Sequence, residues 1–221
     1  MARYDLLRPV CHLACYLTKW TEECDTKLHR LMCWIHSSLE HRMIGWVGED
    51  ETVETVAPHL YADADLGGCI RTQRSTSGVY QVMRGLHTNF PIEGISKRQP
   101  YVRVSTPEAE LVACNFAMTT SGLPSMTIWK KILTDTVVLH VHEDNHAMIR
   151  VMHTGKNPTM KYLERVHRMN VAWMHEQFNR DDKTMNYTIS KNMRADIFTK
   201  EFPNGRLWRD ACIMINITTK E

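Results

Sequence analysis

One helix start, at Ser105, constrains the order of secondary structure along most of this chain. Ser105-Thr-Pro-Glu108 carries the serine, proline and glutamate that a capping box places at a helix N-terminus. The helix predicted there has Leu111, Cys114 and Met118 on its apolar side. Strand-like segments stand before and after it, so we expect an α/β fold that packs helices on a sheet.

Three strand-like segments precede this helix and a fourth follows it. The first three are His59 to Asp63, Gly78 to Arg84 and Ile92 to Ser96, with turn residues between them. Consecutive strands joined by turns predict an antiparallel meander. The β-branched run Thr136 to Val141 predicts the fourth strand, which ends at Glu143-Asp144.

Shorter elements complete the predicted order. Asn145 to His153 predicts a helix that the breakers Gly155 to Pro158 end, and residues 161–178 predict another helix. Residues 186–189 predict a fifth strand, and Met193 to Lys200 a last turn of helix. The predicted order is therefore β-β-β-α-β-α, followed by a helix, a strand and a helical turn.

The first 48 residues have a different character. Residues 5–46 read as helical, and an apolar stripe between Asp25 and Glu40 recurs at three- and four-residue steps: Leu28, Leu31, Met32, Ile35 and Leu39. The acidic segment 49–58 lacks helical periodicity and predicts a linker. We therefore expect a helical segment over 1–48, a linker over 49–58 and a larger domain over 59–221.

Composition excludes several protein classes. The 221 residues include 27 Lys and Arg against 25 Asp and Glu, so the net charge of +2 neither demands nor excludes a nucleic-acid partner. No stretch of about 18 apolar residues occurs, so we expect no membrane partner. Seven cysteines without a C-x-x-C pair indicate neither a disulfide framework nor a zinc ribbon.

Four carboxylates stand at the ends of predicted elements. Asp63 lies at the end of the first strand, Glu110 in the first turn of the central helix, Asp144 after the fourth strand and Asp196 in the last helical turn. Brought together, four such groups would repel one another unless hard cations such as Mg²⁺ neutralised them. On physics alone the signal is weak, because the chain has 25 acidic residues to choose from.

The motifs around these residues carry more information. Their order is Tyr61-Ala-Asp-Ala-Asp-Leu-Gly-Gly68, Arg74-Ser-Thr-Ser-Gly78, Ser96-Lys-Arg-Gln99, Ser105-Thr-Pro-Glu-Ala-Glu-Leu-Val-Ala113, Glu143-Asp-Asn145 and Ala195-Asp-Ile-Phe-Thr-Lys200. Together they resemble the ribonuclease H domain of copia-type LTR retrotransposon polyproteins. Residues 1–46 resemble the end of the reverse transcriptase region that precedes that domain. The resemblance implies a five-stranded mixed sheet flanked by helices.

The resemblance also implies a function. It is metal-dependent cleavage of the RNA strand of an RNA·DNA hybrid, with Asp63, Glu110, Asp144 and Asp196 as catalytic metal ligands. Two Mg²⁺ ions, with Mn²⁺ as an alternative, would activate a water and stabilise the leaving oxygen. The implied partners are the hybrid and the reverse transcriptase region of the same polyprotein. The implied location is a retrotransposon particle in the cytoplasm or the nucleus.

Cations interleaved with hydroxyls are the predicted nucleic-acid contact. The candidates are Arg74, Ser75, Ser77, Lys97 and Arg98. Such side chains suit the phosphates of a duplex backbone, and little sequence preference is expected because a hybrid is recognised by its shape and 2′-hydroxyls. A solvated charged face is the alternative interpretation.

Departures from the family motivate other hypotheses. Leu66 stands where the family has tryptophan, Lys161-Tyr-Leu163 lacks the family's histidine, and Glu201 replaces a proline. His153, His167 and His175 are the candidates to replace that histidine. One alternative function is a catalytically impaired remnant that only binds nucleic acid or packs against a polymerase. Another is a DNA-directed nuclease of the same fold.

Several nearby residues have a structural interpretation instead. Asp65 is expected to order its loop, and Glu108 to act in the capping box. His140 and His142 alternate on one strand and could suggest a transition-metal site, but no third ligand is evident at a suitable spacing. We expect these two histidines to be buried or hydrogen-bonded.

Overall fold

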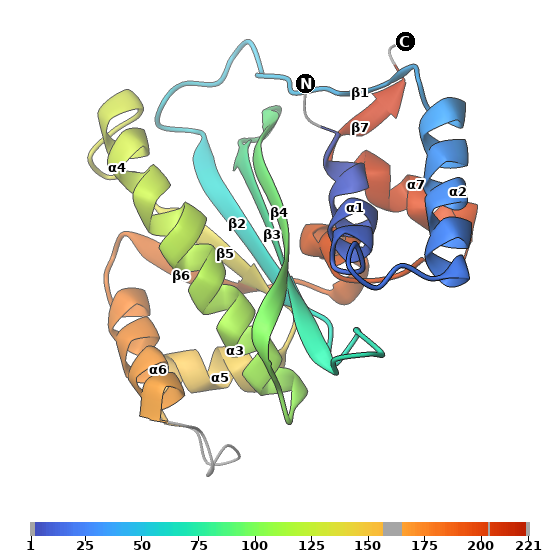
Figure 1. The fold of residues 1–221 in the computed structure, drawn as a ribbon. Coiled ribbons are helices and arrows are strands. Elements are labelled where there is room, and N and C mark those ends of the chain that lie inside the picture. Colours follow the sequence, from blue (N-terminus) through green and yellow to red (C-terminus); the bar gives the residue numbers. More distant parts are fainter. Residues whose placement is uncertain (1–2, 157–164, 203, 220–221) are drawn as a thin grey trace.

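The centre of the computed structural model is a five-stranded mixed sheet (Figure 1). The structure describes residues 3–156, 165–202 and 204–219, with the backbone alone over 165–170. The sheet has the order β4-β3-β2-β5-β6, with bounds β2 Ala57–Ala64, β3 Arg74–Arg84, β4 Asn89–Val102, β5 Leu139–Glu143 and β6 Lys183–Tyr187. Strands β2, β5 and β6 are parallel, and β3 is antiparallel to both β2 and β4. The predicted meander and mixed sheet are confirmed.

Helices cover both faces of the sheet (Figure 1). One side carries α3 (Thr106–Ala117), α4 (Leu123–Ile132), α5 (His146–Thr154) and α6 (Arg165–Phe178). The other side carries α1 (Leu7–Ala14), α2 (Glu22–Ser37), α7 (Gly205–Met214) and the short 3₁₀ helix η4 (Arg194–Phe198). The expected α/β fold, with helices flanking a five-stranded mixed sheet, is therefore present.

The alternation of side chains along β2 separates two hydrophobic cores. Leu60 and Ala62 are fully buried on the α3 side, whereas Tyr61 between them packs with Tyr80 and Phe198 on the η4 side. A strand buried on both faces reads as a continuous apolar run, which explains why β2 tolerates polar groups only near its ends.

The predicted start of α3 is confirmed. Ser105 is the N-cap, and its hydroxyl accepts a hydrogen bond of 3.4 Å from the backbone N–H of Glu108. The Glu108 carboxylate accepts in return from the N–H of Val104, one residue before the N-cap. Leu111, Cys114 and Met118 are all buried, as the apolar spacing predicts.

Other elements differ from the predictions at their boundaries. Strand β5 starts at Leu139, β6 covers Lys183–Tyr187, and the last helical turn is the 3₁₀ helix η4. Helices α4 and α7 and the strand β7 (Ile217–Thr219) were not predicted. The start of α4 carries Pro124 in its first turn, a signal that sequence analysis could have used.

The N-terminal segment is not helical throughout, which corrects the prediction for residues 5–46. Two helices are followed by a strand, β1 (His41–Met43), which pairs antiparallel with β7 near the C-terminus. In α2, Leu31 is buried against Leu13, whereas Leu28 and Met32 are exposed. The expected apolar stripe is therefore buried only in part.

The segment predicted as a linker, 49–58, already contains the first residues of β2. In the part of the chain that the structure describes, no helix combines the length and apolar character needed to cross a bilayer.

Candidate metal centre

Adjacent parallel strands bring two carboxylates to one edge of the sheet. Tyr61 of β2 pairs with His142 of β5, and Asp63 and Asp144 each follow two residues later along the chain. Asp196 reaches the same place from η4. Oxygen atoms of Asp63, Asp144 and Asp196 all lie within 4.8 Å of one another.

A second group of carboxylates shares Asp144 with the first. Glu110 from α3, Glu143 at the end of β5 and Asp144 offer oxygen atoms that also lie within 4.8 Å of one another. The structure thus brings all four sequence-predicted acids together and adds Glu143 as a fifth. Glu143 precedes Asp144 on the strand, where alternation points it to the opposite, fully buried face.

Gly78 allows η4 to approach the sheet closely. Gly78 pairs with Asp63 on β2, and a Cβ at this position would lie 2.7 Å from the Ala195 carbonyl oxygen and 2.8 Å from the Thr199 methyl group. Real Cβ atoms do not come this near to a backbone oxygen. The glycine of the Arg74-Ser-Thr-Ser-Gly78 motif therefore helps to place Asp196 beside Asp63.

The carboxylates are buried to different degrees. Asp63 is 1%, Glu110 3% and Glu143 0% exposed, whereas Asp144 and Asp196 are half-buried. Burial raises the pKa of Glu110 well above its ordinary range, and the charges of Glu143 and Asp63 raise it further. Burial also raises the pKa of Glu143, and of Asp63 despite the attraction of Lys200.

Asp196 responds in the same way. Burial, and next the charge of Asp63, raise its pKa to about 7 although Lys200 opposes the shift. The Lys200 ammonium group lies 2.7 Å from the Asp196 Oδ1 atom and 3.8 Å from the Asp63 Oδ1 atom. Thr199 donates a hydrogen bond to Asp63, and Ser190 donates one to Asp144.

The second group has no such compensation. Among the described residues, no Lys or Arg forms an ion pair with Glu110 or Glu143. The Oε2 atoms of Glu110 and Glu143 are buried and find no hydrogen-bond partner among the described residues. Unpaired buried carboxylate oxygens are costly, and an all-oxygen donor set is the one that hard divalent cations take. The cluster is therefore consistent with divalent metal binding.

The cluster opens into a groove of about 440 Å³, which makes it accessible to a ligand. Asp63, Glu110, Asp144 and Lys200 line this groove together with His146. His146 is exposed, and its ring stacks on Tyr187 at a centroid distance of 4.0 Å. Sequence analysis did not select His146, although it stands directly after Glu143-Asp-Asn145.

The histidines that were selected lie elsewhere or are not described. His153 is exposed on α5 and does not line the groove, and His175 is hydrogen-bonded to the Met152 carbonyl at 2.7 Å. Lys161 to Leu163 and the side chain of His167 fall outside the described residues.

The residues with a predicted structural role have one. Asp65 accepts a hydrogen bond from the N–H of Thr76 and lies 3.5 Å from Arg8, so it orders the turn before β3. His140 and His142 are hydrogen-bonded to Thr184 and Thr188, each at 2.8 Å. The clusters of possible metal ligands formed by the described residues contain carboxylates alone.

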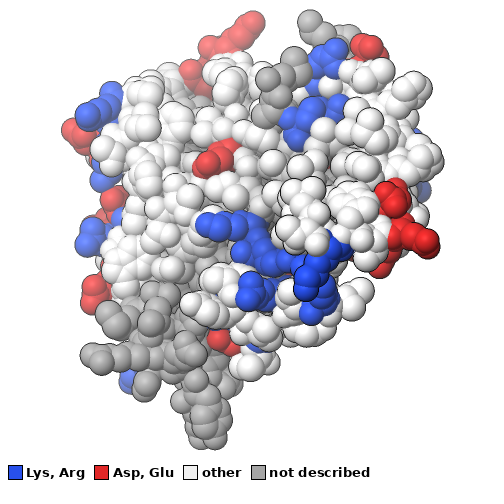
Figure 2. All heavy atoms as spheres, viewed as in Figure 1, with Lys and Arg blue, Asp and Glu red and all other residues white. Residues whose placement is uncertain are grey.

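The predicted nucleic-acid contacts divide into two groups. Arg74 and Lys97 are exposed and Arg98 is half-buried, and Figure 2 shows Lys and Arg side chains gathered over this part of the molecule. The two serines lie in the interior instead. Ser75 accepts from the N–H of Gly67, and Ser77 accepts from Gln99. The surface therefore offers the three cations and not the two hydroxyls.

Comparisons with known proteins give similarity at the level of the fold. No protein-family model matches the sequence. LC11 ribonuclease H1, isolated from compost by a metagenomic approach, is 16% identical, with a TM-score of 0.43 over 65% of this chain and 92% of that chain. The same protein in complex with an RNA/DNA hybrid gives 16% identity and a TM-score of 0.42, over 64% and 93%.

A third solved structure is the N-terminal ribonuclease H domain of Rv2228c from Mycobacterium tuberculosis. It is 10% identical, with a TM-score of 0.41 over 72% of this chain and 97% of that chain. The chain described here has a five-stranded mixed sheet with flanking helices. What its cluster does must be argued from its own residues.

Proposed function

We propose that this chain is a metal-dependent endonuclease that cleaves the RNA strand of RNA·DNA hybrids. The observation that carries the proposal is the convergence of five carboxylates in two groups that share Asp144, two of them with buried oxygens that lack a partner among the described residues. Such an arrangement destabilises the protein unless cations enter it. A costly cluster of this kind is a candidate functional site.

The two groups of carboxylates define two places for an ion. Asp63, Asp144 and Asp196 would hold one Mg²⁺ or Mn²⁺, and Glu110, Glu143 and Asp144 the other. When bound, a pair of such ions supplies an activated water and a counter-charge for the leaving oxygen of a phosphodiester.

The surrounding residues orient these ligands. Thr199 fixes one oxygen of Asp63 by a hydrogen bond, and the backbone N–H of Asn145 donates to Glu143 at 3.1 Å. His146 lines the mouth of the groove and is exposed, so its imidazole can carry a proton between bulk water and the groove. We propose His146 for the place of the family's histidine.

The substrate proposal rests on the cations beside the groove. In the sheet register, Ala64 pairs with Ser77 and Ser77 with Lys97, so Lys97 lies two strands, or about 10 Å, from the carboxyl end of β2. Arg98, next to Lys97 on β4, and Arg74, at the start of β3, extend this cationic surface. A phosphate backbone crossing these strands would meet the cations and the groove together.

The origin of the chain is also a proposal. The six ordered motifs between Tyr61 and Lys200 support derivation from a copia-type retrotransposon polyprotein, with the reverse transcriptase region as partner and the retrotransposon particle as location. A decayed copy would keep the fold and lose the chemistry, so the activity itself has to be measured.

The test is cleavage of a labelled RNA·DNA hybrid with and without Mg²⁺. We expect metal-dependent loss of the RNA strand by the wild type, and its abolition in Asp63→Asn and Glu110→Gln. Glu176→Gln, an exposed acid on α6, is the matched control and should cleave normally. A folded wild type that binds the hybrid without cutting it would indicate a remnant, and cleavage of duplex DNA alone would indicate a DNA-directed nuclease.

A further inference from the structure

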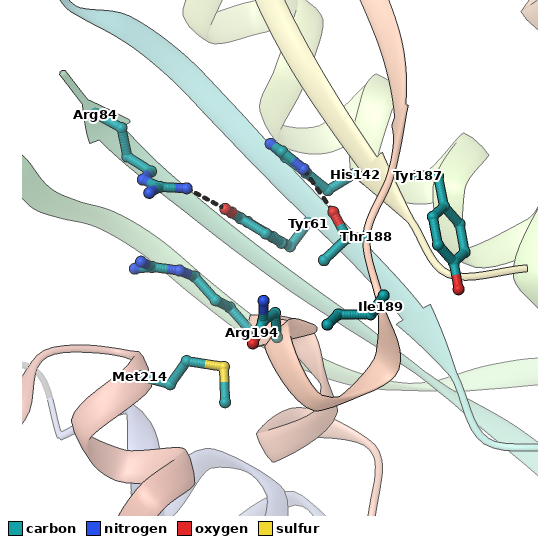
Figure 3. Close-up of a pocket in the computed structure, with 9 residues that line it drawn as sticks. Tyr61, Arg84, His142, Tyr187, Thr188, Ile189, Arg194 and Met214 are labelled. Atoms are coloured by element: carbon teal, nitrogen blue, oxygen red, sulfur yellow. Dashed lines mark hydrogen bonds between the residues drawn. The ribbon is translucent and has the colours of Figure 1, made fainter. Parts of the chain in front are cut away.

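A second cavity lies beside the carboxylate cluster, on the face of the sheet that carries Asp63 and Asp144. Tyr61 and His142, which line it, stand two residues before these acids on β2 and β5 (Figure 3). Alternate residues of a strand share a face, so the cavity is about 7 Å from the cluster along the strands. Its volume of about 420 Å³ is in the range of sites for small molecules.

Two arginines give this cavity its charge. Arg84 from the end of β3 and Arg194 from η4 line it, and the lining contains no acidic residue. Both side chains are half-buried, and among the described residues neither forms an ion pair with a carboxylate. Two guanidinium groups without a counter-ion at one cavity favour an anionic ligand.

Tyr61 holds the two arginines in place. Arg84 donates a hydrogen bond of 2.9 Å to the Tyr61 hydroxyl, and the Cζ atom of Arg194 lies 5.6 Å from the centre of the Tyr61 ring. Figure 3 shows both guanidinium groups reaching to the same side, one on either side of the tyrosine hydroxyl. Arg194 also donates a hydrogen bond of 3.2 Å to the Asn89 side-chain oxygen. Each guanidinium has five N–H donors, so donors remain for a ligand on both arginines.

Both ring nitrogens of His142, in the remaining wall, are already hydrogen-bonded. One is bonded to Thr188 and the other to His59, both at 2.8 Å. Ile189 and Met214 give an apolar surface beside the arginines.

We propose that this cavity binds the phosphate group of a small phosphate ester, with Arg84 and Arg194 as the two anchors. A tetrahedral phosphate with several acceptor oxygens can take N–H donors from both guanidinium groups at once. The organic part of the ester would lie against Ile189 and Met214. The proposal does not depend on nuclease activity, because it involves neither the carboxylates nor a metal.

The test is isothermal titration in EDTA at constant ionic strength, with adenosine monophosphate, inorganic phosphate and adenosine as probes. We expect both phosphate-containing probes to bind the wild type and adenosine to bind at least tenfold more weakly than its monophosphate. Arg84→Met and Arg194→Met should each weaken phosphate binding at least tenfold. Arg180→Met, an exposed arginine outside the cavity, should bind as the wild type does.

A second variant guards against loss of folding. Asn192 lines the cavity and is exposed, so Asn192→Asp adds a negative charge without changing side-chain size. It should weaken phosphate binding at least tenfold, whereas Asn179→Asp, exposed and outside the cavity, should not. Unchanged binding in Arg84→Met, Arg194→Met and Asn192→Asp would overturn the proposal, as would equal affinity for adenosine and its monophosphate.

Two further measurements distinguish a small phosphate ester from a nucleic-acid strand, and this cavity from the nuclease site. A short single-stranded RNA that binds more tightly than the monophosphate, with the same sensitivity to Arg84→Met, would show that the bound phosphate belongs to a strand. Asp63→Asn should lose hybrid cleavage and keep phosphate binding, so failure of the nuclease and failure of this pocket give different results.

Discussion

Strands β2 and β5 carry two neighbouring clusters of ionisable groups, and burial shifts the pKa values of the two clusters in opposite directions. His59 and His142 form one cluster, where burial lowers the pKa of His59 to about 2 and of His142 to about 3. The carboxylates form the other, where burial raises the pKa of Asp63, Glu110, Glu143 and Asp196. In both clusters the interior disfavours the charged form.

The clusters differ in how their polar atoms are satisfied. His59 and His142 are hydrogen-bonded to each other, and Thr188 takes the remaining nitrogen of His142. In the carboxylate cluster, Glu110 and Glu143 each keep a buried oxygen without a partner among the described residues. The polar atoms in the stack of His59 and His142 are satisfied within the chain, whereas the carboxylate cluster keeps buried oxygens that a cation could satisfy. The comparison thus separates a satisfied polar cluster from a candidate cation site.

The largest expected effect comes from Glu110→Gln, which removes one buried charge from the unsatisfied cluster. We expect cleavage to fall by at least about ten-thousandfold, in the range found for members of a catalytic unit. Metal-free stability should rise by about 1–3 kcal/mol, because a buried like charge is removed. Urea unfolding in EDTA, together with hybrid cleavage, measures both changes.

The same variant should lose its response to metal. Mg²⁺ at a hundred times its dissociation constant should stabilise the wild type by about 2.7 kcal/mol and stabilise Glu110→Gln much less. If Mg²⁺ stabilised both proteins equally, Glu110 would not hold metal. The carboxylate cluster would then be stable without a cation, as the stack of His59 and His142 is stable without a ligand.

Gly78→Ala tests the positioning of the cluster without touching a carboxylate. The new methyl group would meet the Ala195 carbonyl and the Thr199 methyl, so η4 must shift away from β3. We expect a loss of about 1–3 kcal/mol of stability, as for other overpacked sites, and a fall in hybrid cleavage because Asp196 moves from Asp63.

Gly205→Ala is the matched control for this prediction. Gly205 begins α7, and the nearest atom to an added Cβ there is 3.9 Å away, on the flexible side chain of Arg209. This variant should cleave as the wild type does. Equal activity of Gly78→Ala and wild type would show that the close approach of η4 is not needed.

The stack of His59 and His142 should make the free energy of unfolding depend on pH. The folded pKa values of His59 and His142 lie below the ordinary value of 6.5, so below pH 6.5 the unfolded chain binds protons that the folded chain does not. The contribution of these two histidines to stability should therefore fall as the pH falls from 6.5, by about 2 kcal/mol per histidine at pH 5.

His59→Gln should reduce this loss by the share of one histidine, measured by urea unfolding at pH 7, 6 and 5. His153→Gln, which replaces an exposed histidine on α5, is the control and should keep the wild-type slope. An unchanged slope in His59→Gln would mean that the stack takes up protons without cost, as a solvated cluster would.

The sequence predicted the carboxylate cluster better than its surroundings, for a physical reason. Asp63 and Asp144 stand at strand ends, where turn and cap signals are strong, and ordered motifs flank both of them and Asp196. Glu143 was missed because it occupies the buried face of β5, where a carboxylate is not expected. Glu143 joins the cluster because α3 packs over this face of β5, and the local sequence does not encode that packing.

The same limit explains the serines and the arginines. Ser75 and Ser77 were predicted as surface contacts, but helices cover both faces of β3 and bury them. Arg84 and Arg194 are far apart in the sequence and meet only because η4 packs across β3. Local patterns indicate which elements form, whereas sites built by packing between distant elements require the structure.

The smallest expected effect is that of Lys200→Gln, which removes the cation that forms ion pairs with the cluster among the described residues. Lys200 lies near Asp63 and Asp196 but its side chain is 40% exposed, so the ion pairs are partly screened.

The Lys200 ammonium group competes with a divalent ion for the same oxygens. We therefore expect Mg²⁺ to bind about 1.4- to fivefold more tightly to the variant, the factor that corresponds to ~0.2–1 kcal/mol of lost ion pairing. Titration of Mg²⁺ followed by thermal unfolding measures this, with Lys131→Gln on α4, an exposed lysine outside the groove, as control. Weaker Mg²⁺ binding to Lys200→Gln than to wild type would instead mean that Lys200 orients the carboxylates for the ion, and that the cluster is organised in advance as fully as the histidine stack.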